Sequence, residues 1–379
     1  MTLPRPRDLL LLAVAALIVL PVAAVLGSWL EWDAHTAGIL REMAVTVLPG
    51  YTVTSVVLCI AVGFGVALVG TVSAAAVTLF DFRGRRFFEW ALLLPLAMPS
   101  YVVAYAYTDF LQFSGPMQGW IRATFGLEGR VFPEVRNTAG AAVVFVFTLY
   151  PYVYLLARAA LSERAAHLME AARLLGAPLA TRVLRGALPL ARPAGAAGVA
   201  LALMETLADF GVASYFGITT FTTGIYKAWL AMDNRVAAAQ LATSLLAVVV
   251  VLLALGHRAQ RRMRFAASRG ARAGSAEAQP ARLSGRRAAL AVALCSLPIL
   301  AGFVLPVLFM LRPLAADWSV LPWDRFLQWA WNSVRLGALT AVLAIAVALL
   351  LASSLRRGGD AITRGVVRLA GLGYAIPGA

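Results

Sequence analysis

Two carboxylates lie inside one of the most apolar stretches of this sequence. Glu205 and Asp209 belong to the segment METLADFG and are four positions apart, a spacing that predicts one shared helical face. Charged side chains in an apolar membrane helix are costly, so they usually face the protein interior or a water-filled path. Two interpretations are open at this point. The pair lines a path for a cation, or it belongs to a structural hydrogen-bond network that includes Thr206.

A group of aromatic residues in a second apolar stretch could line the same path. Tyr101 and Tyr105 are also four positions apart and share a predicted helical face. Pro95 and Pro99 precede them, and proline interrupts the backbone hydrogen bonds of a helix, often where the helix moves or lines a cavity. A simple kink with aromatic residues at the membrane interface is the alternative interpretation.

No pattern in the sequence predicts catalysis, a metal site or a cofactor. His35, His167 and His257 fall in separate loops, and no cluster of histidine, cysteine and glutamate has ligand spacing. Cys59 and Cys295 lie within predicted membrane helices, where small core residues are expected. A glycine-rich lysine loop for phosphates is also missing. We therefore expect a protein that is not an enzyme, with any ATP bound by another subunit.

The longest amphipathic segment, Ser162–Pro193, lies between two strongly apolar runs. Apolar residues recur in it at helical spacing, and charged residues fill the other faces. Ser162 fits an N-cap, Gly176 suits the left-handed conformation that ends a helix, and Pro178 suits the start of a second helix. We expect a helix, a tight turn and a second helix. An amphipathic helix lying on the membrane surface is the alternative.

The same segment carries a pattern of small residues. Glu170, Ala171 and Ala172 are followed four residues later by Gly176 and, after about a dozen more, by a Leu-Pro pair that ends in Pro189. This spacing resembles the cytoplasmic coupling loop of ABC-importer permeases. Three other segments resemble the ferric-iron group of that family: LPLAMPSYVVAYAY (94–107), METLADFGVASYFG (204–217) and TTFTTGIYKAWLAMD (219–233).

The resemblance implies a permease subunit of a bacterial ABC importer. Ferric iron is the expected cargo, and thiamine, polyamine or phosphonate are the alternatives. Two cytoplasmic ATPase subunits and a periplasmic substrate-binding protein are the implied partners. The residues that would transmit the movement of the ATPases are Glu170, Ala171, Ala172, Gly176 and Pro189. Glu170 would instead shape the loop if it pairs with Arg173 or Arg182.

A second class of transporter has to be weighed against this resemblance. An ion-driven secondary transporter would also contain repeated helical bundles. It gives no reason for a cytoplasmic helical loop of about 30 residues with this pattern. The ABC-importer interpretation is therefore favoured.

Composition indicates a membrane protein. Hydrophobic residues make up 61% of the 379, charged residues make up 13%, and the mean hydropathy is +0.80. Soluble domains carry about 25% charged residues, so a bilayer is the expected solvent. We expect an all-α polytopic membrane protein with about eight complete transmembrane helices and a partial ninth near residue 366. The expected complete spans are 9–30, 52–79, 87–108, 139–161, 194–216, 236–256, 288–311 and 332–352.

The positive charges behind the net charge of +15 are distributed along the chain as the positive-inside rule requires of a membrane protein. With the N-terminus in the cytoplasm, 24 lysines and arginines fall on the cytoplasmic side and 9 fall outside. We therefore expect a multi-pass protein of the bacterial inner membrane in contact with membrane lipid, and no nucleic-acid partner. Arg5 and Arg7 would also fit a signal peptide. The apolar run that follows extends to Leu30, which favours an uncleaved first helix.

An internal repeat divides the chain. An offset of 278 residues aligns Ser55 with Ser333 and Pro99 with Pro377, which predicts two related bundles. The same offset moves Glu170 to position 448. A second coupling loop would therefore lie beyond the last residue, and we expect a C-terminally truncated chain.

The repeat gives the expected domain bounds. Residues 1–256 form the first permease half, with six helices and the coupling loop at 162–193. Residues 288–379 form a truncated second half. Between them, 257–287 is rich in Arg, Ala, Gly and Ser and is expected to be a flexible cytoplasmic linker. Contact of this linker with anionic lipid headgroups is the alternative to a plain connector.

Overall fold

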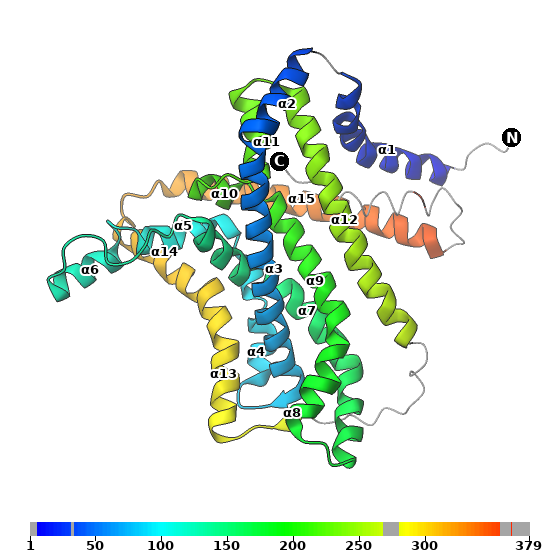
Figure 1. Cartoon of the computed structure of the whole chain (residues 1–379), viewed down its shortest axis with the longest axis vertical. Helices are drawn as coiled ribbons and strands as arrows, with labels where there is room; N and C mark the ends of the chain where they lie inside the picture. The colour runs from blue at the N-terminus through cyan, green and yellow to red at the C-terminus, as the bar shows by residue number, and fades with distance from the viewer. Residues whose placement is uncertain (1–5, 32–33, 268–279, 357–364, 366–379) are drawn as a thin grey trace.

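The computed structural model describes residues 6–31, 34–267, 280–356 and 365. Long helices run side by side through the body of the molecule, and shorter helices extend from one side (Figure 1). Helices dominate the described residues, as an all-α membrane protein requires. The exception is one parallel pair of two-residue strands.

The elements of the first part of the chain are α1 (Pro6–Gly27), η1 (Ser28–Leu30), α2 (Ala34–Thr46), α3 (Leu48–Leu79), β1 (Phe80–Asp81), α4 (Arg85–Ala91), η2 (Leu94–Ala97), α5 (Ser100–Leu111), α6 (Pro116–Phe125) and α7 (Thr138–Leu174). Those of the remainder are α8 (Leu179–Thr181), η3 (Arg182–Ala187), α9 (Leu188–Ala208), α10 (Gly211–Phe216), α11 (Phe221–Tyr226), η4 (Lys227–Ala231), α12 (Arg235–Ala267), β2 (Ala281–Arg282), α13 (Gly285–Ile299), η5 (Leu300–Val304), α14 (Leu305–Ala316) and α15 (Trp323–Arg356).

Six helical stretches among the described residues are long and apolar enough to cross a membrane, or seven if a bent pair of helices counts as one span. The expected total of eight complete spans is not reached. The first expected span, 9–30, is helical in α1 but is not one of the six. The expected ninth span, from about 366, lies outside the described residues. The six are Leu48–Leu79, Thr138–Ser162, Leu179–Ala208, Arg235–Leu252, Gly285–Ala316 and Trp323–Ser354.

The expected span at 87–108 is broken. The helical stretches Arg85–Ala97 and Ser100–Phe125 meet at an angle of 87°. Met98 between them is extended, with φ −105° and ψ 118°. Because Pro99 disfavours a helical conformation in the residue before it, the helix ends there and α5 starts in a new direction. The prolines therefore produce a sharp bend where the sequence predicted one continuous span.

The centre of the bundle is α7, which packs against α3 and α9. A Cβ added to Gly70 of α3 would lie 2.6 Å from the Cβ of Val153 on α7. A Cβ added to Gly198 of α9 would lie 2.6 Å from the Cα of the same valine. Small residues let helices approach closely where lipid gives no hydrophobic driving force between them. Glycines on two helices thus fix α7 between them.

The expected flexible linker, 257–287, is partly regular. Helix α12 continues to Ala267, and β2 pairs in parallel with β1, with Ala281 opposite Phe80. The Leu283 amide donates to the Asp81 carbonyl at 2.9 Å. These backbone bonds satisfy polar groups directly after α3, where the helix can no longer satisfy them. Residues 268–279 lie outside the described part of the chain.

Helix α15 lies across the other long helices in Figure 1. Adding 278 to the bounds of α3 gives 326–357, close to the observed bounds of α15. The helix lengths are therefore compatible with the predicted repeat. The domain division that the repeat implies stays a prediction.

Candidate functional site

The segment 162–193 contains one turn, and it differs from the expected arrangement at its start. Ser162 is not an N-cap, because α7 runs without a break from Thr138 to Leu174. Its hydroxyl donates instead to the carbonyl of Ala159 within the helix. The sequence shows a change from apolar to charged residues at this point. One continuous helix that passes from lipid into water shows the same change from apolar to charged residues as the start of a new helix.

The turn itself forms as the glycine predicts. Gly176 has φ +75°, the left-handed conformation. Its amide donates to the Arg173 carbonyl at 3.0 Å, and the Ala177 amide donates to the Ala172 carbonyl at 3.0 Å. This is the Schellman pairing that closes a helix C-terminus. Pro178 then precedes α8, in an extended conformation with ψ 152°.

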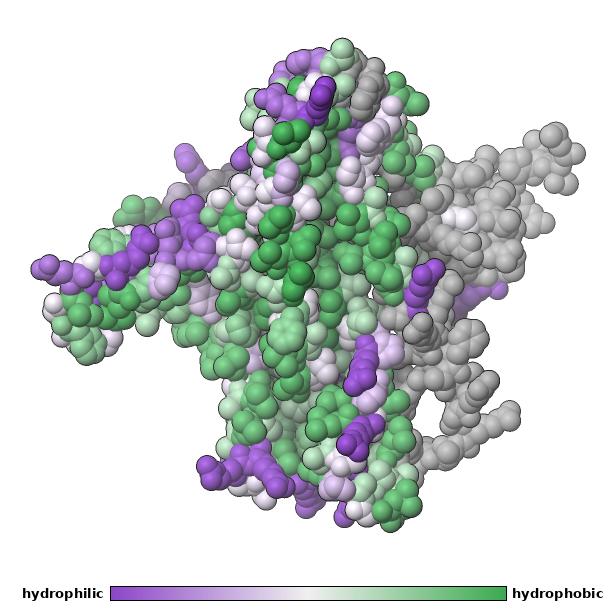
Figure 2. Space-filling view, viewed as in Figure 1, coloured by the Kyte–Doolittle hydropathy of each residue, from purple (hydrophilic) through white to green (hydrophobic). Residues whose placement is uncertain are grey.

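The tip of the turn exposes apolar surface. Leu174 and Leu175 are 84% and 87% exposed, and Figure 2 shows hydrophobic atoms at the lower end of the molecule, where the turn lies in Figure 1. Glu170 and Ala171 are exposed beside them. Two almost fully exposed leucines on a protruding turn are costly in water, and such surfaces usually mark contact with a partner.

The other expected residues of the segment are placed differently. Ala172 is half-buried, and Pro189 is half-buried in the first turn of α9. Glu170 forms no ion pair with Arg173 or Arg182; the three ion pairs found among the described residues involve other acidic groups. Glu170 therefore presents its charge to solvent.

One face of α7 fastens this helix to α4 and η2. Tyr150 donates to the Leu92 carbonyl at 2.8 Å, and Tyr154 donates to the Glu89 carbonyl at 2.8 Å. The Arg158 guanidinium lies 3.1 Å from the Glu89 carboxylate. The three α7 residues are spaced by four and so share one face. This spacing is visible in the sequence and would have indicated a contact face.

The two tyrosines predicted from the sequence line a cavity of about 460 Å³ between α5, α10 and α14. Tyr101 and Tyr105 are 54% and 46% exposed. The Tyr105 ring lies 5.9 Å from the ring of Tyr215, centroid to centroid. Gly211 approaches Tyr101 so closely that an added Cβ would lie 2.9 Å from the tyrosine Cβ. Both tyrosines therefore line one cavity, and its place in a path for cargo stays a prediction.

The helix predicted to carry both carboxylates ends one residue before Asp209, and Glu205 still lies close enough to interact electrostatically with Asp209. Helix α9 ends at Ala208, and Asp209 is extended, with ψ 120°. Its Oδ1 accepts from the Val212 amide at 2.7 Å. Aspartate favours such turns because its short side chain can satisfy a backbone amide three residues on. Glu205 remains in α9, half-buried.

The Thr206 hydroxyl donates to the Ala202 carbonyl at 2.8 Å within α9. A network that joins this hydroxyl to the two carboxylates stays a prediction. Asp209 orders the start of α10, directly before Phe210 and Gly211, which line the aromatic cavity. The residues that directly follow Asp209 line the same cavity as the two tyrosines, so Asp209 lies near that cavity.

A second cavity, of about 310 Å³, was not predicted from the sequence. It lies between α10, α11 and η4, and its one lining charge is Lys227. The hydroxyl residues Ser214, Thr219 and Thr223 also line it. The lysine ammonium lies 5.7 Å from the centre of the Tyr51 ring. Lys227 begins the π-helical turn η4, and such turns are frequent at functional sites.

Metal ligation has no cluster to support it in the described part of the chain. Groups of three or more histidine, cysteine, aspartate or glutamate residues that could hold a metal ion are not found there.

Comparison with known proteins identifies a protein family that the chain matches. A family model described as the inner membrane component of binding-protein-dependent transport systems matches residues 66–265. That range contains the turn after α7, the two carboxylates, the cavity at Lys227 and every residue of the aromatic cavity except Met310.

Curated relatives of the chain are permease proteins with different printed substrates. The chain is 27% identical over 199 residues to the Fe(3+)-transport system permease protein FbpB 2 of Haemophilus influenzae; the match covers 52% of this chain and 35% of the relative. It is 28% identical to the sulfate transport system permease protein CysT of Salmonella typhimurium, covering 53% and 70%. It is 26% identical to the putative 2-aminoethylphosphonate transport system permease protein PhnU of the same organism, covering 51% and 66%. The chain thus spans about a third of the ferric relative's length and about two thirds of the others'.

Proposed function

Because the chain belongs to the family of binding-protein-dependent transport system inner membrane components, we propose that it is the membrane permease of an ATP-driven importer. Its relatives are permease proteins of transport systems rather than enzymes. In this proposal two cytoplasmic ATPase subunits hydrolyse ATP, and a periplasmic binding protein delivers the cargo. The chain lies in the bacterial inner membrane with its N-terminus in the cytoplasm.

The exposed turn after α7 is the observation that carries the proposal. Leu174 and Leu175 form an apolar tip that Gly176 closes with a fixed geometry, and Glu170 adds a negative charge beside it. A rigid apolar tip fits a groove on a partner, and the charge adds specificity more than affinity. We assign this tip as the contact with the ATPase, and we call the turn that carries it, residues 174–176, the coupling turn.

Helix α7 gives a physical route from the tip to the aromatic cavity. The same helix that ends at the tip is tied to α4 through Tyr154 and Arg158. Further along, the Thr148 hydroxyl lies 3.0 Å from the Ser100 hydroxyl at the start of α5, which carries Tyr101 and Tyr105. Displacement of the tip therefore reaches the bend between α4 and α5 through direct contacts. In the proposed mechanism, this displacement opens or closes the cavity around the cargo.

Ferric iron is the cargo we propose first. One relative is named as a ferric-iron permease. Asp209 directly precedes Phe210 and Gly211, which line the aromatic cavity, and Glu205 lies four residues before it in the sequence. Carboxylates are suitable transient partners for a cation in a water-filled path. The carboxylate of Asp209 is held in place by backbone amides, including that of Val212 at 2.7 Å.

An oxyanion such as sulfate or a phosphonate is the second candidate, favoured by the cavity at Lys227. An ammonium group among hydroxyl side chains suits the recognition of an oxyanion. Two of the relatives are named for sulfate and 2-aminoethylphosphonate. The two candidates differ in the sign of charge that the path must accept.

Cargo-stimulated ATP hydrolysis distinguishes these candidates. The chain would be reconstituted in liposomes with the ATPase and the binding protein encoded beside its gene, and the binding protein would be loaded with ferric iron, sulfate or 2-aminoethylphosphonate. We expect stimulation by the ferric form and its loss in the double variant Glu205→Gln, Asp209→Asn. The matched variant Lys227→Gln should leave ferric stimulation unchanged. Stimulation by an oxyanion, with loss only in Lys227→Gln, would instead establish the second candidate.

A further inference from the structure

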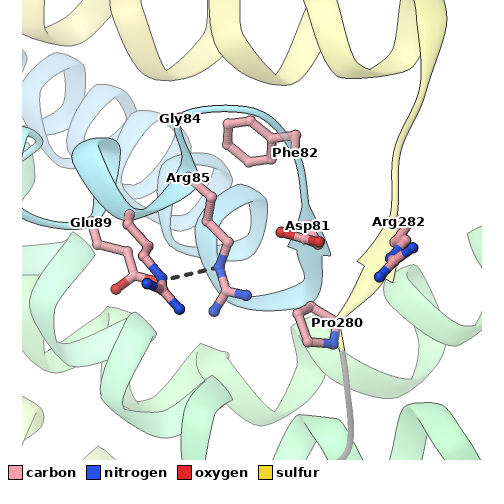
Figure 3. Close-up of a pocket in the computed structure, with 8 residues that line it drawn as sticks. Asp81, Phe82, Gly84, Arg85, Glu89, Pro280 and Arg282 are labelled. Atoms are coloured by element: carbon pink, nitrogen blue, oxygen red, sulfur yellow. Dashed lines mark ion pairs between the residues drawn. The ribbon is translucent and has the colours of Figure 1, made fainter.

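A cavity of about 730 Å³ lies at the end of the bundle where β1 and β2 meet α4. Figure 3 shows Asp81 and Arg282 on the paired strands at one side of this cavity, and Arg85 and Glu89 on α4 at the other. The remaining lining residues are Phe82, Gly84, Arg86 and Pro280. Neither the coupling turn nor the aromatic cavity contributes a residue to it.

Among the charged residues that line the cavity, some form ion pairs and others do not. Glu89 is neutralised twice, because its carboxylate lies 3.2 Å from the Arg85 Nε and 3.1 Å from the Arg158 guanidinium. Arg86 and Arg282 are exposed, and neither forms an ion pair with another described residue. Asp81 is thus the one remaining carboxylate in a lining with two arginines available to a ligand.

The surroundings add further positive charge and aromatic surface. Three further arginines close in sequence to the lining are exposed: Arg83 between β1 and α4, and Arg286 and Arg287 at the start of α13. On α4, Phe87 and Trp90 are 51% and 54% exposed, and their rings pack edge to face at 5.2 Å. Membrane helices end here, and exposed aromatic rings next to arginines are typical of the level of lipid headgroups.

We propose that this cavity binds the phosphate of an anionic phospholipid headgroup. Arg86 and Arg282 contact the phosphodiester, because the guanidinium fork matches the oxygens of a phosphate. The rings of Phe87 and Trp90 lie against the glycerol and upper acyl region. Basic pockets between membrane helices on the cytoplasmic side bind such headgroups in the same way.

A lipid is favoured over a free phosphate for a physical reason. Two arginines open to solvent beside Asp81 hold any phosphate weakly in salt, so a soluble phosphate gains little from them. A lipid phosphate is kept at the level of the cavity by its acyl chains, so its effective concentration there is high. The inference does not depend on the cargo or on the coupling turn.

Native mass spectrometry of the purified full chain tests this proposal. The chain in mild detergent would be titrated with phosphatidylglycerol or with phosphatidylcholine of the same acyl chains. We expect preferential retention of phosphatidylglycerol. In the double variant Arg86→Gln, Arg282→Gln its affinity should fall about 30-fold, since each basic residue near an anionic surface contributes about 1 kcal/mol. The pair Arg86→Lys, Arg282→Lys should retain most of the binding.

Three controls make the outcome decisive. Arg325→Gln, an exposed arginine on α15, should leave retention unchanged, and an equal loss there would overturn the assignment. Displacement of phosphatidylglycerol by millimolar inorganic phosphate would identify a free-anion site instead. Displacement by the purified partner ATPase would identify a protein contact. Either displacement, or equal retention of both lipids by the unmodified chain, refutes the lipid site.

Discussion

The conformation of Gly176 allows a graded test of the coupling turn. Its φ of +75° is strained for any residue with a side chain, yet a Cβ added there meets no atom within 4 Å. Substitution therefore changes backbone energy without a steric clash. Asparagine, alanine and proline at this position form a series of increasing conformational cost.

The magnitudes follow from the backbone. Alanine in a left-handed conformation costs about 1–2 kcal/mol, whereas asparagine costs less because it tolerates this region. If the whole cost falls on the ATPase-bound conformation, Gly176→Ala weakens ATPase binding by about 5- to 30-fold. Gly176→Pro cannot adopt a positive φ, and it removes the amide that donates to the Arg173 carbonyl. It should abolish a defined turn.

Co-purification of the ATPase and its cargo-stimulated hydrolysis are the assays for this series. We expect binding to decrease from glycine through asparagine and alanine to proline, with membrane insertion unchanged because the tip is exposed. Gly186→Ala is the matched control. Gly186 lies in η3, ten residues after Gly176, also without atoms near an added Cβ, but in a helical conformation that alanine favours. Undiminished ATPase binding by Gly176→Pro would refute the assignment of the turn.

Three further substitutions test the packing and the cap, each by thermal unfolding in detergent. Gly198→Ala should destabilise the fold by about 1–3 kcal/mol because its Cβ would overlap α7, whereas Gly63→Ala, whose nearest neighbour would be at 3.5 Å, should be tolerated; equal effects would contradict the packing argument. Tyr150→Phe should cost about 1–2 kcal/mol because it leaves a buried carbonyl unpaired, and a neutral result would show that another donor reaches that carbonyl. Asp209→Ala should cost about 1 kcal/mol through loss of the acceptor for the Val212 amide, and Asp209→Asn should not; similar losses in both variants would assign the stability to charge instead.

The sequence predicted best the structural features that a single residue type or the length of an apolar run specifies by itself. Gly176 predicted a left-handed helix end, and it has one. Apolar length predicted most of the membrane spans, because a bilayer imposes a minimum on each helix.

Tertiary context decided the features that the sequence did not predict. Helical spacing placed Glu205 and Asp209 on one face, but periodicity does not mark the residue at which a helix ends. Here the aspartate itself provides an acceptor for the next segment, and α9 stops one residue before it. The pairing of β1 with β2 joins residues about 200 positions apart through two residues each, too short a pattern for any periodicity to detect.

The contacts of α7 restrict how a force at its tip can be transmitted. Tyr150, Tyr154 and Arg158 hold one face of the helix to backbone and carboxylate groups of α4 and η2 over two turns. A helix held by several directional contacts on one face cannot slide along that face without breaking them together, which costs more than breaking one. Rotation of α7 and α4 as a unit preserves all of them. The strain of such a rotation then falls on the bend at Met98 and Pro99, where the helical hydrogen bonds are already interrupted. The movement expected at the aromatic cavity is therefore a change in the angle between α5 and α10, with the bend as its hinge.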